Sequence, residues 1–138
     1  DSADTVLALE PDHAQLAKLG RKVGVAGVYQ APAATHLISR ASREARAFSA
    51  SAGRAASPLI EVRAFAAPIG VPEDPVTGSL NASLAQWLID ARALPARYVA
   101  AQGAALGRAG RVHVQRDAQG QVWVGGDCVA VIGGEVRL

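Results

Sequence analysis

The chain contains the stretch Arg63-Ala-Phe65-Ala-Ala-Pro68-Ile-Gly70-Val-Pro-Glu73-Asp74-Pro75-Val-Thr77-Gly78-Ser79-Leu-Asn81, which combines an acidic pair, a proline turn and a small-residue helix start. Pro75 fixes its own backbone and disfavours a helical conformation at Asp74. Thr77 and Ser79 are residues that cap helices, and Gly78 lets a ligand approach the backbone. The stretch therefore predicts a carboxylate beside exposed helix amides, a pattern suited to anion binding and proton transfer.

A long apolar run follows this helix start and predicts a helix from Gly78 to about Asp90. From Leu80 onward, its polar positions are Asn81, Ser83, Gln86 and Asp90. A helix that is apolar nearly all round is normally buried on several sides. We therefore expect a central buried helix.

Strand-like segments surround this helix in the sequence. They lie at 23–29, 59–65, 97–102, 111–116, 121–125, 128–132 and 135–138, with glycine-rich turns between the later ones. A shorter helix is expected from Pro11-Asp12-His13 to Gly20, after a strand or entry segment at 6–9. A short strand is expected at 36–40, and 41–58 reads as a solvated insertion. The order predicts an α+β fold, a mostly antiparallel curled sheet or barrel wrapped around one central helix, with one shorter outer helix.

The motif residues resemble the PhzF family of phenazine-biosynthesis-like isomerases. The resemblance is carried by Arg63 and Phe65, then Gly70, then the run from Glu73 to Ser79. A second family stretch, Gln102-Gly103-x-x-Leu106-Gly107-Arg108-x-Gly110-Arg111-Val112, follows at the expected distance. A third, Val122-Trp-Val124-Gly125-Gly126, precedes the expected closing strands. The resemblance implies the diaminopimelate epimerase fold. It also implies that 1–138 is a single domain, the C-terminal half of a two-domain protein whose N-terminal half is absent. The start at Asp1 and the lack of methionine agree with an excised piece.

Composition excludes several classes of protein. With 138 residues and half of them hydrophobic, the chain suits one domain with one core. The net charge of +2 is too small to indicate nucleic acid or a membrane surface as partner, and no apolar run approaches a bilayer span of roughly 20 residues. The lone Cys128 excludes an internal disulfide and favours the cytoplasm; we expect it to be buried in an apolar strand. Three scattered histidines offer no metal-ligand spacing, and no organic cofactor is implied.

The candidate site residues each have a simpler structural interpretation. Asp74 alone could be a solvated turn residue, and Thr77, Gly78 and Ser79 could cap the helix and nothing more. The resemblance implies that Asp74 contacts the substrate, orienting it or assisting proton relay. It also implies substrate binding by Thr77, Gly78 and Ser79, with amides from Gly78 and Ser79 and a hydroxyl donor from Ser79. A phosphate-loop reading fails because no lysine follows the glycine.

Three arginines, Arg63, Arg108 and Arg111, suit structural pairing or an anionic ligand, and pairing is the commoner use of strand-end arginines. The family's acid/base glutamate belongs to the N-terminal domain, and Glu73 does not correspond to it.

The favoured function is a PhzF-like isomerase or epimerase half, with cofactor-independent proton transfer on a small anionic, carboxylate-bearing metabolite bound between two domains. Its expected partners are the missing N-terminal domain and a second copy in a homodimer. The isolated chain is expected to be inactive. The alternative is a catalytically inactive small-anion-binding or interaction domain, and a basic nucleic-acid module is a third reading that rests only on the arginine-bearing insertion.

Overall fold

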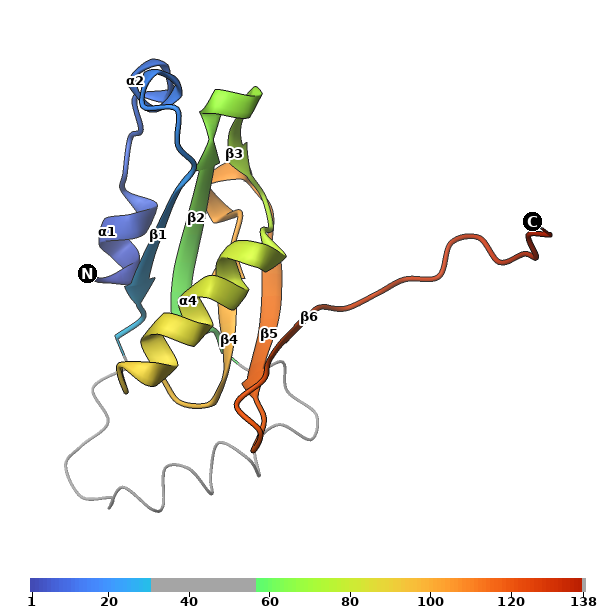
Figure 1. Ribbon diagram of the computed structural model, residues 1–138. Helices are drawn as coiled ribbons and strands as arrows, with labels where there is room; N and C mark the ends of the chain where they lie inside the picture. Colours follow the sequence, from blue (N-terminus) through green and yellow to red (C-terminus); the bar gives the residue numbers. More distant parts are fainter. Residues whose placement is uncertain (31–56, 138) are drawn as a thin grey trace.

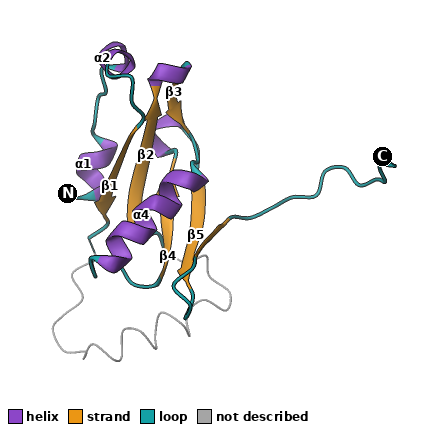
Figure 2. Ribbon diagram, in the orientation of Figure 1, coloured by secondary structure: helices purple, strands orange, loops and turns teal. Residues whose placement is uncertain are grey.

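The computed structural model describes residues 1–30 and 57–137 (Figure 1). The strand expected at 36–40 and nearly all of the insertion expected at 41–58 lie outside these ranges. The described residues form an α+β fold, as predicted. The larger helix and the sheet make two layers, and two short helices lie toward the N-terminus (Figure 2).

Six strands form one mixed sheet. Five of them, β1 (Val23–Val28), β2 (Ile60–Ala66), β4 (Arg97–Gln102), β5 (Gly110–Arg116) and β6 (Val122–Gly125), lie in the order β1-β2-β4-β5-β6. The sixth, β3 (Val71–Asp74), pairs with β2. Among the pairs formed by these six strands, only β2–β4 is parallel. The prediction of a mostly antiparallel sheet is confirmed, but the expected closure into a barrel is wrong for the described residues, whose sheet is open.

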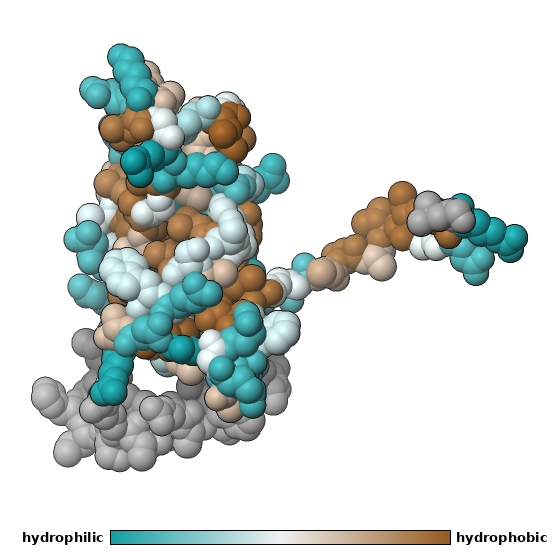
Figure 3. All heavy atoms as spheres, viewed as in Figure 1, coloured by the Kyte–Doolittle hydropathy of each residue, from teal (hydrophilic) through white to brown (hydrophobic). Residues whose placement is uncertain are grey.

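The open sheet follows from the path of the C-terminal segment. Strands were expected at 128–132 and 135–138, yet residues 126–137 form no helix or strand and extend away from the body (Figure 1). Their apolar side chains are 83–91% exposed at Val129, Val131, Ile132 and Val136, and the segment is largely hydrophobic in Figure 3. Cys128 is exposed in this segment, so its expected burial is also wrong.

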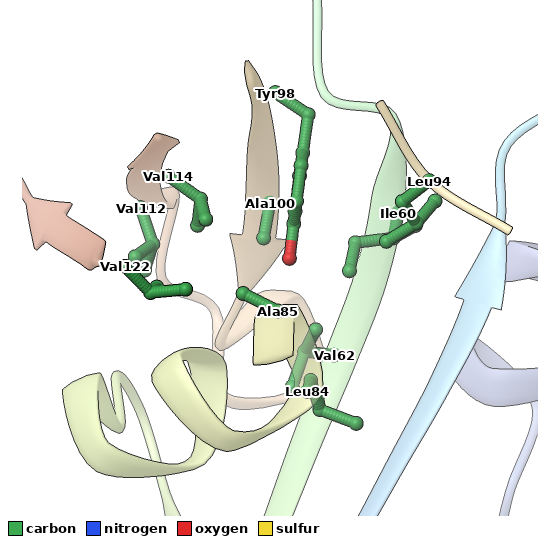
Figure 4. Packing of buried hydrophobic residues seen from close by; sticks show 10 residues of the cluster. All are labelled: Ile60, Val62, Leu84, Ala85, Leu94, Tyr98, Ala100, Val112, Val114 and Val122. Carbon is green, nitrogen blue, oxygen red and sulfur yellow. The ribbon is translucent and has the colours of Figure 1, made fainter. Parts of the chain in front are cut away.

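The core lies between the sheet and α4 (Gly78–Asp90). Alternate residues of a strand point to the same face, and Ile60 and Val62 of β2 thereby face Leu84 and Ala85 of the helix. Tyr98 and Ala100 of β4 and Val112 and Val114 of β5 extend the same cluster (Figure 4). Fully burying one such side chain stabilises the fold by about 1.5–3 kcal/mol.

The helix α4 has the predicted bounds but is not buried on all sides. Asn81, Leu84 and Ala85 are buried, whereas Trp87 is 67% exposed. Because the sheet is open, the described residues cover only one side of this helix. No helix in the described ranges has both the length and the apolarity to cross a bilayer.

Two short helices precede the sheet. In α1 (Ala3–Leu7), the Ser2 side chain caps the helix by accepting from the Thr5 amide, and Ala3 and Val6 are buried. This segment overlaps the strand or entry segment expected at 6–9, so a strand there is wrong. In α2 (His13–Lys18), Asp12 accepts from the Gln15 amide, which confirms the predicted helix start.

Candidate functional site

A cavity of about 430 Å³ lies at the N-terminal end of α4, where the start of β1 and the end of β2 meet the helix. Its polar lining residues are Lys22, Asp74, Thr77, Ser79 and Ser83. Three of the four residues singled out in the sequence thus share one cavity. Gly78 begins α4 beside them but is not part of the lining.

Asp74 and Thr77 are joined directly. Asp74 is the last residue of β3, and Thr77 stands immediately before α4. The Thr77 hydroxyl donates to Asp74 Oδ2 at 2.7 Å, and its side chain makes no capping bond to the helix. Capping is therefore not what the Thr77 hydroxyl does. Its bond fixes the carboxylate at the helix start instead.

The buried side chain of Gln102 holds Asp74 and Thr77 in place through hydrogen bonds, a role that the sequence did not indicate. It is 1% exposed at the end of β4, and its Nε2 donates to the Asp74 carbonyl oxygen at 2.9 Å and to Thr77 Oγ1 at 3.0 Å. Its Oε1 accepts from the Thr77 amide at 3.1 Å and from Asn81 Nδ2 at 2.9 Å. The available signal was a polar residue at a core-facing position of an otherwise apolar strand.

Two glycines let the neighbouring chain pass close to the proline turn. Gly103 has φ +92°, and a Cβ there would lie 2.6 Å from the Pro75 carbonyl oxygen. A Cβ on Gly110 would lie 2.6 Å from both the Gln102 carbonyl oxygen and a methyl group of Val76. The segment from Gln102 to Val112 therefore packs against the turn that follows Asp74, because its glycines leave room for that turn.

Comparison with known proteins assigns the chain to a family. A family model described as phenazine biosynthesis-like protein, PhzC-PhzF, matches residues 1–134. The chain belongs to this PhzF family. An uncharacterized isomerase of Deinococcus radiodurans is 35% identical over 139 residues, which cover 94% of this chain. The chain spans only 38% of that relative's length.

The Arg63 of this PhzF-family chain is a structural residue. Its Nε and Nη2 donate to the two carboxylate oxygens of Glu73 at 2.9 and 2.7 Å, with both side chains 5% exposed. Its Nη1 donates to the backbone carbonyl oxygens of Leu9 at 2.7 Å and Val6 at 3.3 Å. The hydrogen bonds to Glu73 raise the pKa of the Arg63 guanidinium. Arg63 thereby ties β2 to β3 and to the N-terminal segment, and Glu73 is committed to this pair.

The other sequence candidates lie apart from the cavity of the PhzF-family chain. Arg108 is exposed, and Arg111 is exposed and donates to the Gly110 carbonyl oxygen. Cys128 lies in the C-terminal segment. Within residues 1–30 and 57–137, no three His, Cys, Asp or Glu side chains form a group that could hold a metal ion. Lys22 does line the cavity, although the sequence analysis did not single it out as a candidate cation.

Proposed function

We propose that this chain is the substrate-holding half of a PhzF-type isomerase that transfers protons without a cofactor. A small carboxylate-bearing metabolite would bind between this chain and a second domain. The observation that carries the proposal is the gathering of Asp74, Thr77 and Ser79 around one cavity at the start of α4. Family membership and the isomerase name of the Deinococcus radiodurans relative support the reaction class.

The helix start supplies the anion site in this proposal. Amides in the first turn of a helix have no partner within the helix, and the helix dipole favours negative charge there. The Thr77 hydroxyl is held by Asp74 and does not occupy these amides. The amides of Gly78 and Ser79, with the Ser79 hydroxyl, then bind the substrate carboxylate and stabilise charge that develops during proton removal.

Asp74 orients the substrate or relays its proton. Thr77 occupies Oδ2 of the carboxylate, so Oδ1 is the oxygen assigned to the substrate. A positioned acid/base group contributes roughly 10²–10⁴-fold to such a reaction. The main acid/base residue is assigned to the second domain, since Glu73 is held by Arg63 and Asp74 is the only carboxylate that lines the cavity among the described residues.

Deuterium exchange tests the reaction class. The product of the complete reading frame that encodes this chain is incubated in D2O with small carboxylic acids that carry an acidic or allylic C–H bond. Mass spectrometry should detect deuterium uptake into at least one acid. Asp74→Asn and Ser79→Ala should each slow uptake about tenfold or more at unchanged melting temperature.

Exposed positions away from the cavity provide matched controls for the exchange assay. Asp90→Asn and Ser57→Ala make the same chemical changes there and should leave the rate unaltered. Uptake at wild-type rates in both site variants would show that the site is wrongly assigned. If acids bind at the cavity but none exchanges, the small-anion-binding alternative is correct.

A further inference from the structure

The cavity beside Asp74 has an amphipathic lining. Apart from the polar residues, its wall is formed by apolar side chains from β1, β2, the β3 region and α4, including Val23, Phe65, Ile69, Val71 and Leu80. A volume of about 430 Å³ is in the usual range for small-molecule sites, in which a few polar groups orient a ligand whose body lies against apolar walls.

Phe65 is a fixed part of this wall. The Arg63 guanidinium carbon lies 5.1 Å from the centre of the Phe65 ring, and the His13 ring meets it edge-on at 6.0 Å. Arg63 is itself held by Glu73 and by two backbone carbonyls. The apolar surface at Phe65 therefore exists before any ligand arrives.

Lys22 brings a positive charge to the same cavity from a different element. It precedes β1, whose first residue Val23 pairs with Phe65. The next residue, Gly24, lies against the helix so closely that a Cβ would be 2.4 Å from a Leu80 methyl group. This packing fixes the start of β1 beside the first turns of α4. Among the described residues, no carboxylate lies within ion-pair distance of Lys22.

We propose that the cavity selects a carboxylate with an apolar carbon skeleton, and that Lys22 is a specificity-determining residue that pairs with the carboxylate. The skeleton lies against Phe65, Ile69 and Val71, while the amides at the start of α4 bind the same carboxylate from the helix. This inference rests on the proposed function and adds the class of substrate. Compact, polar diacids are poor ligands because their second charge would lose water against an apolar wall.

Amide chemical shifts of Ser79 and Leu80 in the 138-residue chain measure the binding of three probes. Cyclohexanecarboxylate has both charge and skeleton, acetate lacks the skeleton, and cyclohexanecarboxamide lacks the charge. Each buried CH2 group contributes about 0.8 kcal/mol, so cyclohexanecarboxylate should bind at least about tenfold more tightly than acetate. It should also bind more tightly than the carboxamide.

Variants on exposed side chains separate the two halves of the proposal. Lys22→Gln should weaken the binding of cyclohexanecarboxylate about two- to fivefold, which is the scale of an exposed ion pair. It should leave the binding of the carboxamide unchanged. Lys22→Arg should retain most of the affinity, and Lys18→Gln, outside the cavity, should have no effect. Ile69→Ser should weaken the binding of cyclohexanecarboxylate but not that of acetate. Leu19→Ser is the matched control, because Leu19 is 63% exposed against 61% for Ile69 but does not line this cavity.

Each contrary outcome has a distinct meaning. Equal affinity for acetate and cyclohexanecarboxylate overturns the proposed preference for an apolar skeleton. Wild-type affinity of the Lys22→Gln variant for cyclohexanecarboxylate overturns the role of Lys22. A lack of any carboxylate-dependent shift at Ser79 and Leu80, in a chain whose spectrum shows it folded, overturns the whole inference. The deuterium-exchange assay measures the reaction class independently, so failure of this inference and failure of the proposed proton transfer can be distinguished.

Discussion

The side-chain amide of Gln102 donates from Nε2 to the backbone carbonyl oxygen of Asp74 at 2.9 Å, across 28 positions of sequence. Gln102 does not line the cavity, yet the place of the Asp74 carboxylate depends on it. The end of β4 and the start of α4 are consequently one unit, and a change in either should be felt at the site. The same unit includes Thr77 and Asn81, which donate to the other end of the Gln102 side chain.

Replacing Gln102 by leucine should destabilise the chain strongly. The Thr77 amide would lose its acceptor, Asn81 Nδ2 would keep only its bond to the Thr77 carbonyl oxygen, and the Asp74 carbonyl oxygen would lose a donor. Each unpaired buried group costs about 1–3 kcal/mol. We expect urea unfolding to show a loss of about 3 kcal/mol or more. Gln115→Leu, at an exposed position of β5, is the matched change and should cost less than about 0.5 kcal/mol. Similar losses in the two variants would contradict the network described for Gln102.

Two glycines with positive φ should respond differently to alanine. Gly107 has φ +68° and open space around a Cβ, so Gly107→Ala should cost only the backbone term of about 1–2 kcal/mol. Gly103→Ala adds a contact of 2.6 Å with the Pro75 carbonyl oxygen and should cost clearly more. Thermal unfolding compares the two variants directly. Equal melting temperatures would show that the turn after Asp74 yields freely to a Cβ.

The two ion pairs of the described residues should differ in their contribution to stability. Glu73→Gln leaves Arg63 charged and buried without its partner, which typically costs about 3–5 kcal/mol. Asp90→Asn breaks the pair with Arg116, whose side chains are 63% and 30% exposed, and should cost at most about 1 kcal/mol. Urea unfolding of both variants measures the difference. A small effect of Glu73→Gln would argue against the structural role of Arg63.

Two tyrosines should make the fold sensitive to alkali. Burial raises the pKa of Tyr98 to about 12, and burial followed by the hydrogen bond to Glu61 raises that of Tyr29 to about 12. The folded chain therefore holds these protons more tightly than the unfolded chain, whose tyrosines titrate near 10. The free energy of unfolding should be insensitive to these groups below about pH 10 and fall between about pH 10 and 12.

Phenylalanine variants separate the two tyrosines. The Tyr98 hydroxyl is buried without a partner among the described residues, so Tyr98→Phe should preserve or raise stability at pH 7, by up to about 1 kcal/mol. Tyr29→Phe removes the bond to Glu61 Oε2 and should lower it by about 1–2 kcal/mol. Each variant should also reduce the loss of stability at alkaline pH. Urea unfolding at pH 7 and across pH 9–12 measures both effects. Loss of stability at pH 7 in Tyr98→Phe would indicate that its hydroxyl is satisfied.

Local signals in the sequence were sufficient for most elements. The helix from Gly78 to about Asp90 and the strand at 97–102 have the predicted bounds, because a helix start and an alternating or apolar run are properties of neighbouring residues. The motif around Asp74 also indicated the family correctly, since its residues are contiguous in the chain. What these signals say about catalysis stays a prediction.

Contacts between distant residues decided the rest. Periodicity carries no information on which strands pair, so the parallel β2–β4 contact and the open sheet appear only in the structure. The same holds for Gln102, whose polar side chain meets its partners only when the end of β4 lies beside the start of α4. It also holds for Lys22, which lines the cavity next to the close packing of Gly24 on Leu80. In short, sequence alone determined the elements and the family, and tertiary packing determined which side chains share a site, because hydrogen bonds and cavities are formed by residues far apart in the chain.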